Sequence, residues 1–343
     1  MKKILNKKIK ITLLMILTIY GVCHISIFKI WSKKEYNFDN LKGKHLVAYV
    51  TLRDEEAKAI FELFKKETGC TYEYIKLPTE QAVTRILDEA KNPKADIYIG
   101  GTCDGYEILK FNDVLEKYKS FNVKNIPDKF KDSKGYWTGF EIEPLAIAIN
   151  KDSWDKKFNK EHIQKPSSFN DLLNSIYKNS IILPNPITSG TGYTLLASLY
   201  QQLGEEEFIK FIKKIKVNTK AFTVSGFNAV QNVASGEYPI TINFLGDQLI
   251  MEKSNVDLIN VVPKNAGWNV NAVAKIKNRN NNKVASAFID FCLSDYLKDK
   301  LNNFSTGLST KNIKHYDYDI FQQYSFEKAA QNRNRVMELW NNN

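Results

Sequence analysis

Short apolar runs alternate with longer segments of helical periodicity along residues 45–99. In residues 54–68, three acids open the segment, apolar residues recur on one face and Gly69 follows, which predicts a helix with a left-handed C-terminal cap. The alternation predicts strands at 45–50, 71–77 and 95–99 and helices at 54–68 and 79–90. Strand and helix segments of these lengths are typical of a parallel sheet covered by helices, an α/β fold.

A second series of alternating segments begins at residue 144. It predicts strands at 144–150, 180–185 and 238–244 and helices at 191–203 and 246–253. A further strand at 271–276 and a helix near 283–293 resemble a return to the first series. Because ligands of open α/β sheets gather where strands end and helices begin, we expect a site at the turns after Val50, Ile99, Asn185 and Phe244.

Residues 11–28 form an uncharged, mostly apolar stretch that is long enough to cross a bilayer as a helix. Five lysines precede this stretch and three follow it, which predicts an N-terminus in the cytoplasm and the remainder outside. We therefore expect residues 1–31 to be a signal anchor or signal peptide, with a retained anchor favoured, and 32–43 to be a tether. Lipidation at Cys23 stays open, although the residues before it suit a lipidation site poorly.

The net charge of +11 is concentrated at the N-terminus, because residues 1–34 hold eight lysines and no acid. The remaining chain carries only +3, which argues against nucleic-acid binding. Four cysteines and four histidines are too scattered for a disulfide framework or a metal-binding motif. The chain also has no Gly-x-Ser-x-Gly sequence, so a serine hydrolase lacks its most recognisable turn.

The turn at 184–194 is rich in hydroxyl and glycine residues and runs from a predicted strand into a predicted helix. Its Ser189, Gly190 and Thr191 could bind a phosphate or carboxylate through hydroxyls and helix-start amides. A plain capped loop is the simpler alternative.

Thr51 and Arg53 lie at another strand-to-helix junction, where a guanidinium could offer two donors to a planar anion. The alternative is a surface arginine paired with Glu55 or Glu56. The segments 101–104 and 225–226 could likewise be simple turns.

Six segments together give residues 44–310 a resemblance to the bacterial extracellular solute-binding proteins with the type 2 periplasmic-binding fold. The resemblance is to the branch that holds ferric-ion, phosphonate, phosphoglycerate and hexose-phosphate receptors. It rests on Ala48–Leu52, Asn92–Thr102, Trp137–Phe140, Glu143–Ile147, Asn185–Tyr193 and Phe288–Phe291.

The resemblance implies two α/β lobes joined by two hinge crossings, preceded here by one N-terminal hydrophobic helix. Lobe 1 would hold 44–141 plus 268–343, and lobe 2 would hold 144–265. The residues expected to bind the ligand are Thr51, Arg53, Gly101, Thr102, Asp104, Ser189, Gly190, Thr191, Ser225, Gly226, Asp247 and Asn269.

Two differences from the residues of these receptors narrow the range of expected ligands. Hexose-phosphate receptors look to have a His-Asp pair where this chain has Gly246 and Asp247, and an acid in place of Asn269. Recognition of a sugar by this chain is thus in question, while the residues expected to bind the phosphate group are retained. Ferric-ion receptors have adjacent tyrosines as metal ligands, and this chain has no Tyr-Tyr pair, so iron is disfavoured.

We therefore expect a binding protein without catalysis, cofactor or metal, located on the extracytoplasmic face of a bacterial membrane. It would deliver a small anionic, phosphorylated or phosphonate ligand to an ABC permease. The alternatives are a ligand-sensing partner of a membrane histidine kinase, a ferric-ion carrier, and a phosphatase or transferase that uses Asp104 or Asp247.

Overall fold

The computed structural model describes residues 38–158, 163–301, 308–310 and 319–343, and residues 39–343 form one compact unit. The predicted membrane segment and Cys23 lie outside the described residues. Within the described ranges, every helix is too short or too polar to cross a membrane.

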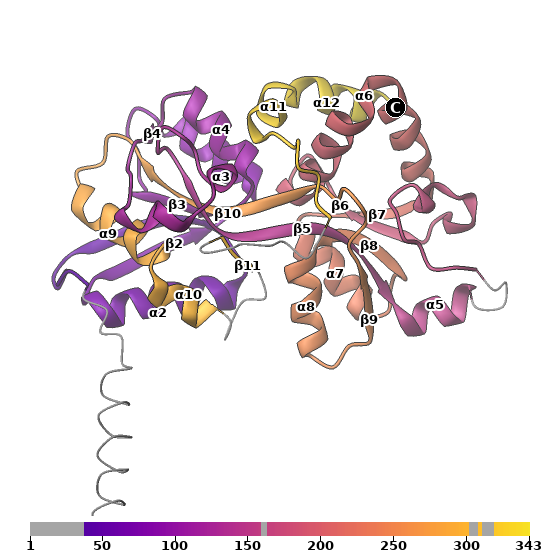
Figure 1. Ribbon diagram of the computed structural model, residues 1–343, viewed down its shortest axis with the longest axis horizontal. Coiled ribbons are helices and arrows are strands. Elements are labelled where there is room, and N and C mark those ends of the chain that lie inside the picture. The colour runs from indigo at the N-terminus through magenta and orange to yellow at the C-terminus, as the bar shows by residue number, and fades with distance from the viewer. Residues whose placement is uncertain (1–37, 159–162, 302–307, 311–318) are drawn as a thin grey trace, which may run out of the picture. The chain divides into compact units, whose positions relative to one another are not determined.

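The strands form one mixed sheet with the order β2-β1-β3-β10-β5-β8-β6-β7 (Figure 1). They are β1 (His45–Thr51), β2 (Thr71–Lys76), β3 (Ile97–Gly100), β4 (Leu115–Glu116), β5 (Thr138–Asn150), β6 (Ile181–Pro184), β7 (Thr219–Thr223), β8 (Ile240–Phe244), β9 (Leu258–Val261), β10 (Trp268–Ile276) and β11 (Leu308–Ser309). The neighbours β1, β2 and β3 are parallel, as are β6, β7 and β8, whereas β5 and β10 run antiparallel to theirs. The parallel pairing expected of the strands at 45–50, 71–77 and 95–99 is confirmed, and the antiparallel β5 and β10, which return the chain between the parallel groups, make the whole sheet mixed.

The long strand β5 divides the sheet into two lobes. Its first half, from Thr138, pairs with β10, and its second half, from Leu145, pairs with β8 and β9. We define the first lobe by the strands on the β10 side of β5 and the second lobe by β6–β9. Residues 262–267 make a second connection between the lobes, and Leu145 N donates to Gly267 O there at 2.8 Å.

Helices cover both faces of the sheet (Figure 1). The α-helices are α2 (Asp54–Thr68), α3 (Thr79–Asp88), α4 (Cys103–Phe111), α5 (Lys151–Phe158), α6 (Gly190–Asn218), α7 (Gly226–Ala234), α8 (Leu245–Lys253), α9 (Asn282–Cys292), α10 (Asp295–Leu301), α11 (Phe326–Gln331) and α12 (Arg333–Asn342). Short 3-10 helices are η1 (Phe121–Asn125), η2 (Asp128–Phe130), η4 (Asp171–Leu173) and η5 (Ser175–Tyr177).

The amphipathic pattern of α2 is confirmed in the packing of the first lobe. Ala57, Ile60 and Phe61 are fully buried, and Phe61 stacks on Phe288 of α9 with ring centroids 4.9 Å apart. Gly69 adopts a φ of 74°, the left-handed cap that the sequence predicts. The three cysteines of the described residues are free and buried.

The C-terminal segment packs against both lobes. After Ile320, which bridges to Ala266, α11 packs against α4 of the first lobe and α6 of the second, and α12 packs against α6 (Figure 1). This placement differs from the expected division, in which residues 268–343 belong wholly to the first lobe.

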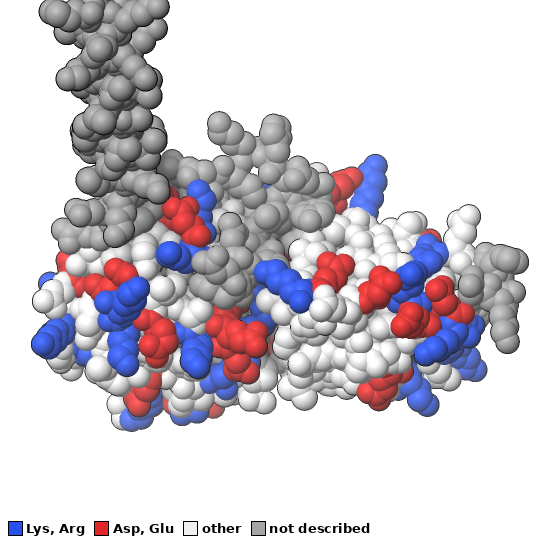
Figure 2. All heavy atoms as spheres, turned by 90° about the horizontal axis from the view of Figure 1, so that it is seen from below, with Lys and Arg blue, Asp and Glu red and all other residues white. Residues whose placement is uncertain are grey.

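Basic and acidic side chains of the described residues alternate on the face shown in Figure 2. This face therefore has no broad positive region of the kind that binds the phosphate backbone of a nucleic acid.

Candidate functional site

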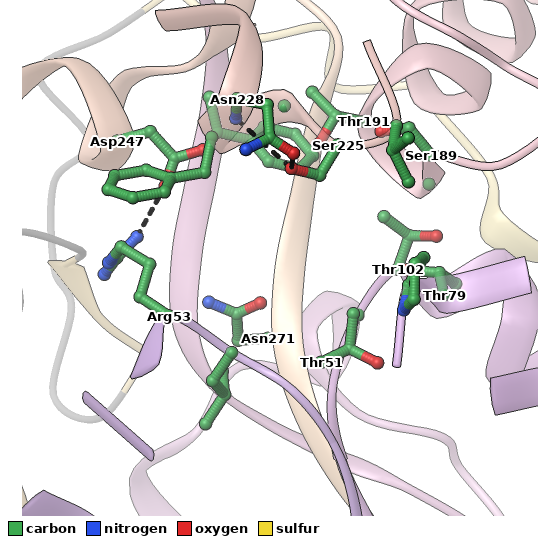
Figure 3. Close-up of a pocket in the computed structure, with 18 of the residues that line it drawn as sticks. Thr51, Arg53, Thr79, Thr102, Ser189, Thr191, Ser225, Asn228, Asp247 and Asn271 are labelled. Atoms are coloured by element: carbon green, nitrogen blue, oxygen red, sulfur yellow. Dashed lines mark hydrogen bonds and ion pairs between the residues drawn. The ribbon is translucent and has the colours of Figure 1, made fainter. Parts of the chain in front are cut away.

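A cavity of about 470 Å³ lies between the two lobes (Figure 3). Its volume is in the ordinary range for a site that holds a small molecule. The residues that line it are Thr51, Leu52, Arg53, Asp54, Glu56, Lys76, Leu77, Pro78, Thr79, Gly101, Thr102, Glu143, Ser189, Gly190, Thr191, Val224, Ser225, Gly226, Phe227, Asn228, Gln231, Phe244, Asp247 and Asn271.

Six helices begin at this cavity: α2, α3 and α4 from the first lobe and α6, α7 and α8 from the second. The first N–H groups of a helix have no acceptor within the helix, and its dipole is positive at that end. Six such ends around one cavity favour an anionic group, even where lysine and arginine side chains are turned to other partners.

One end of the cavity is lined by hydroxyl groups, which face one another across the lobes in Figure 3. The residues concerned are Thr51, Thr79, Thr102, Ser189, Thr191 and Ser225. Ser189 Oγ accepts from Gly192 N at 3.4 Å, and Ser225 Oγ accepts from Asn228 N at 3.2 Å. Thr102 Oγ1 is buried at this end, where the hydroxyl also favours the ionised form of the Asp104 carboxyl.

Glycine allows the two lobes to approach closely at the hydroxyl-lined end. A Cβ on Gly190 would lie 2.5 Å from Thr102 Oγ1 and 2.7 Å from Thr79 Oγ1. Within the second lobe, a Cβ on Gly226 would lie 2.6 Å from Thr191 Oγ1, so glycine also allows α6 and α7 to approach closely. These distances are too short for any larger side chain, so both glycines are required by the arrangement of their neighbours.

The opposite end of the cavity holds Arg53 in a buried group of acids. Its Nη1 lies 2.8 Å from Asp247 Oδ1 and 3.7 Å from Glu143 Oε1, and its Nη2 lies 2.8 Å from Glu56 Oε2. Figure 3 marks the contact with Asp247. The expectation that Arg53 offers its donors to an anion is therefore corrected: the side chain is only 9% exposed and faces carboxylates. The alternative prediction, that Arg53 pairs with Glu56, is confirmed, but this ion pair is buried rather than on the surface.

Burial raises the pKa of these acids, and Glu143 retains its proton near neutral pH. Desolvation, with repulsion from Glu141, holds the pKa of Glu56 well above its ordinary range and raises that of Glu143 to about 8. Desolvation also raises the pKa of Asp247, against the opposing attraction of Arg53. A mixture of protonated and ionised carboxyls can both donate to and accept from hydroxyl groups of a ligand.

The structure places Asp104 and Asn269 outside the cavity. Asp104 is buried and accepts from Arg333 Nη1 at 2.9 Å. Asn269 accepts from Cys103 N and donates to Gly101 O, both at 2.9 Å, so its amide holds the turn that carries Gly101. The neighbouring Asn271 lines the cavity instead and donates to Glu141 at 3.0 Å.

The other ten predicted site residues all line the cavity. The sequence reasoning missed Glu56, Glu143 and Asn271, which come from the first turn of a helix and from the interiors of two strands. Their common signal is a polar residue inside an otherwise buried strand or helix face. That signal is visible for Glu143 and Asn271 only once the strand bounds are known.

The acids do not form a cation site on geometric grounds. Within the described residues, no group of three or more His, Cys, Asp or Glu side chains is arranged to hold a metal ion. The guanidinium of Arg53 lies between the carboxylates that a cation would need.

A cavity between two α/β lobes, bounded by helix starts from both, defines a receptor of the periplasmic binding class. Residues 92–324 match the family described as bacterial extracellular solute-binding protein, and the chain belongs to this family. Its members are binding proteins rather than enzymes, and their location is extracytoplasmic.

Two solved structures are similar to this chain over nearly their full lengths. One is the periplasmic binding protein AfuA from Actinobacillus pleuropneumoniae with exogenous fructose-6-phosphate bound, at 26% identity and a TM-score of 0.79, over 88% of this chain and 98% of that one. The other is the periplasmic binding protein P5PA, at 25% identity and a TM-score of 0.80, over 87% and 99%. An uncharacterised protein of Haemophilus influenzae is 26% identical over 321 residues, 88% of this chain and 90% of the relative.

Proposed function

We propose that this protein captures a small phosphorylated solute, with the phosphoryl group at the hydroxyl-lined end of the cavity. The observation that carries the proposal is the convergence of six helix starts and six hydroxyl side chains on one cavity. Neutral donors of this kind suit an oxyanion, because they supply hydrogen bonds without demanding a compensating charge.

The remainder of the ligand would carry hydroxyl groups toward Arg53 and its acids. A side chain at Gly246 would collide with Glu143, since a Cβ there would lie 2.5 Å from Glu143 Oε2. Glu143 thus fills the space at which related receptors look to carry a histidine, and the polar character of that end is retained. The fructose-6-phosphate bound by AfuA supports a sugar phosphate as the ligand class.

Iron transport is the weaker proposal on chemical grounds. Ferric ion prefers several ionised oxygen ligands, whereas the acids here surround a guanidinium and Glu143 holds a proton near neutral pH.

We propose that binding involves no chemical step. The rival reaction, phosphate hydrolysis through Asp104 or Asp247, lacks a poised group, because each carboxylate is already paired with an arginine. Incubation of the protein with phosphorylated sugars tests this point. Release of inorganic phosphate with turnover would contradict it.

Delivery to an ABC permease is the proposed destination of the ligand, with residues 1–31 as the membrane anchor. Deleting the protein should abolish uptake of the ligand through a constitutively expressed transporter. Unchanged uptake together with lost induction of the uptake genes would instead support a sensing role. Fractionation of the cell envelope tests the anchor. If residues 1–31 are a membrane anchor, the protein should be recovered in the membrane fraction.

A thermal-shift screen tests the ligand class. Fructose 6-phosphate, a phosphoglycerate, a phosphonate, fructose and ferric citrate form the panel. A ligand that binds the native state raises the melting temperature by mass action. We expect the shift from phosphorylated compounds and none from fructose. Stabilisation by ferric citrate alone would contradict the proposal.

A further inference from the structure

Arg333, at the start of α12, contacts three helices that belong to two lobes. Its Nη1 lies 2.9 Å from Asp104 Oδ2 in α4, and its Nη2 lies 2.6 Å from Glu80 Oε2 in α3. Its guanidinium carbon lies 3.9 Å from the ring centroid of Tyr193 in α6. Two neighbouring ion pairs and a cation–π contact hold the planar group in one orientation.

Each partner of Arg333 lies one or two residues beyond a residue of the cavity. Glu80 follows Thr79 directly, while Asp104 and Tyr193 each lie two residues beyond a cavity threonine, Thr102 or Thr191. Arg333 therefore contacts the first turns of the three helices whose starts form most of the hydroxyl-lined end. The same three starts meet at Gly190, whose neighbours are Thr79 and Thr102.

The segment that carries Arg333 is attached firmly to the second lobe. Tyr193 Oη donates to Ala329 O at 2.6 Å. Gln201 and Ser325 exchange two hydrogen bonds, each 3.0 Å long. Contacts to the first lobe are made by Arg333, by the packing of α11 on α4 and by Trp268 of β10. Trp268 Nε1 donates to Phe321 O at 2.9 Å, and its ring lies 5.0 Å from that of Phe326. Within the described residues, the ion pairs between this segment and the first lobe are those of Arg333 with Glu80 and Asp104.

We propose that Arg333 is a positioning residue for ligand binding, which holds the starts of α3, α4 and α6 at the spacing that the phosphoryl group requires. The proposal rests on the proposed function, because it takes that end of the cavity as the phosphate subsite. Its consequence is that a residue outside the cavity sets the affinity for the phosphorylated end of the ligand. Helix starts contribute to anion binding only when they point at the same place.

The test compares Arg333→Met with Arg335→Met in the full-length protein. Arg335 lies on the same helix but pairs with Glu205 and Glu338 and is 45% exposed, so its replacement removes the same charge without touching α3 or α4. Titration calorimetry with fructose 6-phosphate should show at least a tenfold loss of affinity for R333M. R335M should stay within twofold of the wild type. Arg333→Lys should recover part of the loss, because an ammonium keeps the charge but lacks the planar, two-sided set of donors that points one nitrogen at each carboxylate.

A triple variant, E80Q/D104N/R333M, separates positioning from charge compensation. This variant has no buried unpaired carboxylate at positions 80 and 104, yet it lacks the guanidinium that joins the three helices. We expect its affinity to remain at least tenfold below that of the wild type. Recovery of wild-type affinity would overturn the proposal, and so would an R333M variant that binds as the wild type does.

Hydrogen exchange gives a readout that needs no ligand. R333M should accelerate amide exchange in residues 79–83, 103–107 and 190–194, while R335M should leave these segments unchanged. If the wild type binds none of the phosphorylated probes, the proposed function fails, and exchange alone decides the positioning role. Unchanged exchange in all three segments of R333M would then refute it, and R333K serves in its place if R333M does not fold.

Discussion

Individual side chains set the width of the ligand cavity and the protonation of its acidic groups. Much of its hydroxyl-lined end could be predicted from sequence, because Thr51, Thr102 and Ser189 each lie between the end of a strand and the start of a helix. At the acid end, Arg53 and Asp247 could be predicted as site residues, but their pairing could not, because it joins residues 194 positions apart. Long-range pairing of this kind depends on how the lobes face each other, which local patterns do not specify.

The variant Gly190→Ala should weaken binding of fructose 6-phosphate. Its Cβ would overlap the Thr79 and Thr102 hydroxyls, and an open form can relieve that overlap while a closed, liganded form cannot. Overpacking costs about 1–3 kcal/mol, which corresponds to a loss of affinity on the order of tenfold or more. Calorimetry measures the change, with Ile187→Ala in the neighbouring exposed loop as control. Equal affinity for G190A and wild type would mean that the lobes need not approach this closely.

Glu143 should make the protein less stable as the pH rises. Burial raises its pKa from 4.5 to about 8, so between these values the folded state binds a proton that the unfolded chain has lost. The free energy of unfolding therefore falls between about pH 5 and pH 8, and the raised pKa values of Glu56 and Asp247 act in the same direction.

The variant Glu143→Gln removes this titration, so its melting temperature should fall less steeply over that pH range than that of the wild type. Glu206→Gln, at an exposed position, should keep the wild-type slope. Identical slopes for E143Q and wild type would show that Glu143 is ionised in the folded protein.

Elements are positioned by signals of unequal strength. The amphipathic helix α2 could be predicted almost to the residue because acids, an apolar face and Gly69 all agree. The helix expected at 191–203 instead continues past Gly204 to Asn218, since a second helix follows the break directly. The short elements α4, α7 and β7 were not predicted because their patterns span too few residues to be told from loops.

Gly204 should be required for the stability of α6 but not for binding. Its φ of 72° and ψ of 172° lie in a region that is essentially restricted to glycine, and a Cβ there would meet no other atom within 4 Å. Gly204→Ala should therefore lower the free energy of unfolding by about 1–3 kcal/mol through backbone strain alone. Urea denaturation measures the loss, with Glu207→Ala as control, and a changed ligand affinity would show that the break affects the cavity.

At the scale of the whole molecule, two connections and a C-terminal segment join the lobes. The sequence indicated two α/β groups and a returning strand, but it did not indicate a mixed sheet or a C-terminal segment that packs on both lobes. Both features depend on strand order and on packing between distant helices. Local periodicity contains no information on either.

The central claim is that the protein binds a phosphorylated solute through its phosphoryl group. Titration calorimetry of the full-length protein with fructose 6-phosphate and with fructose, at one pH and ionic strength, tests it most directly. Several hydrogen bonds to a charged group contribute about 1.5–3 kcal/mol each, so the phosphorylated compound should bind at least a hundredfold more tightly. Equal affinities, or binding of fructose alone, would contradict the account.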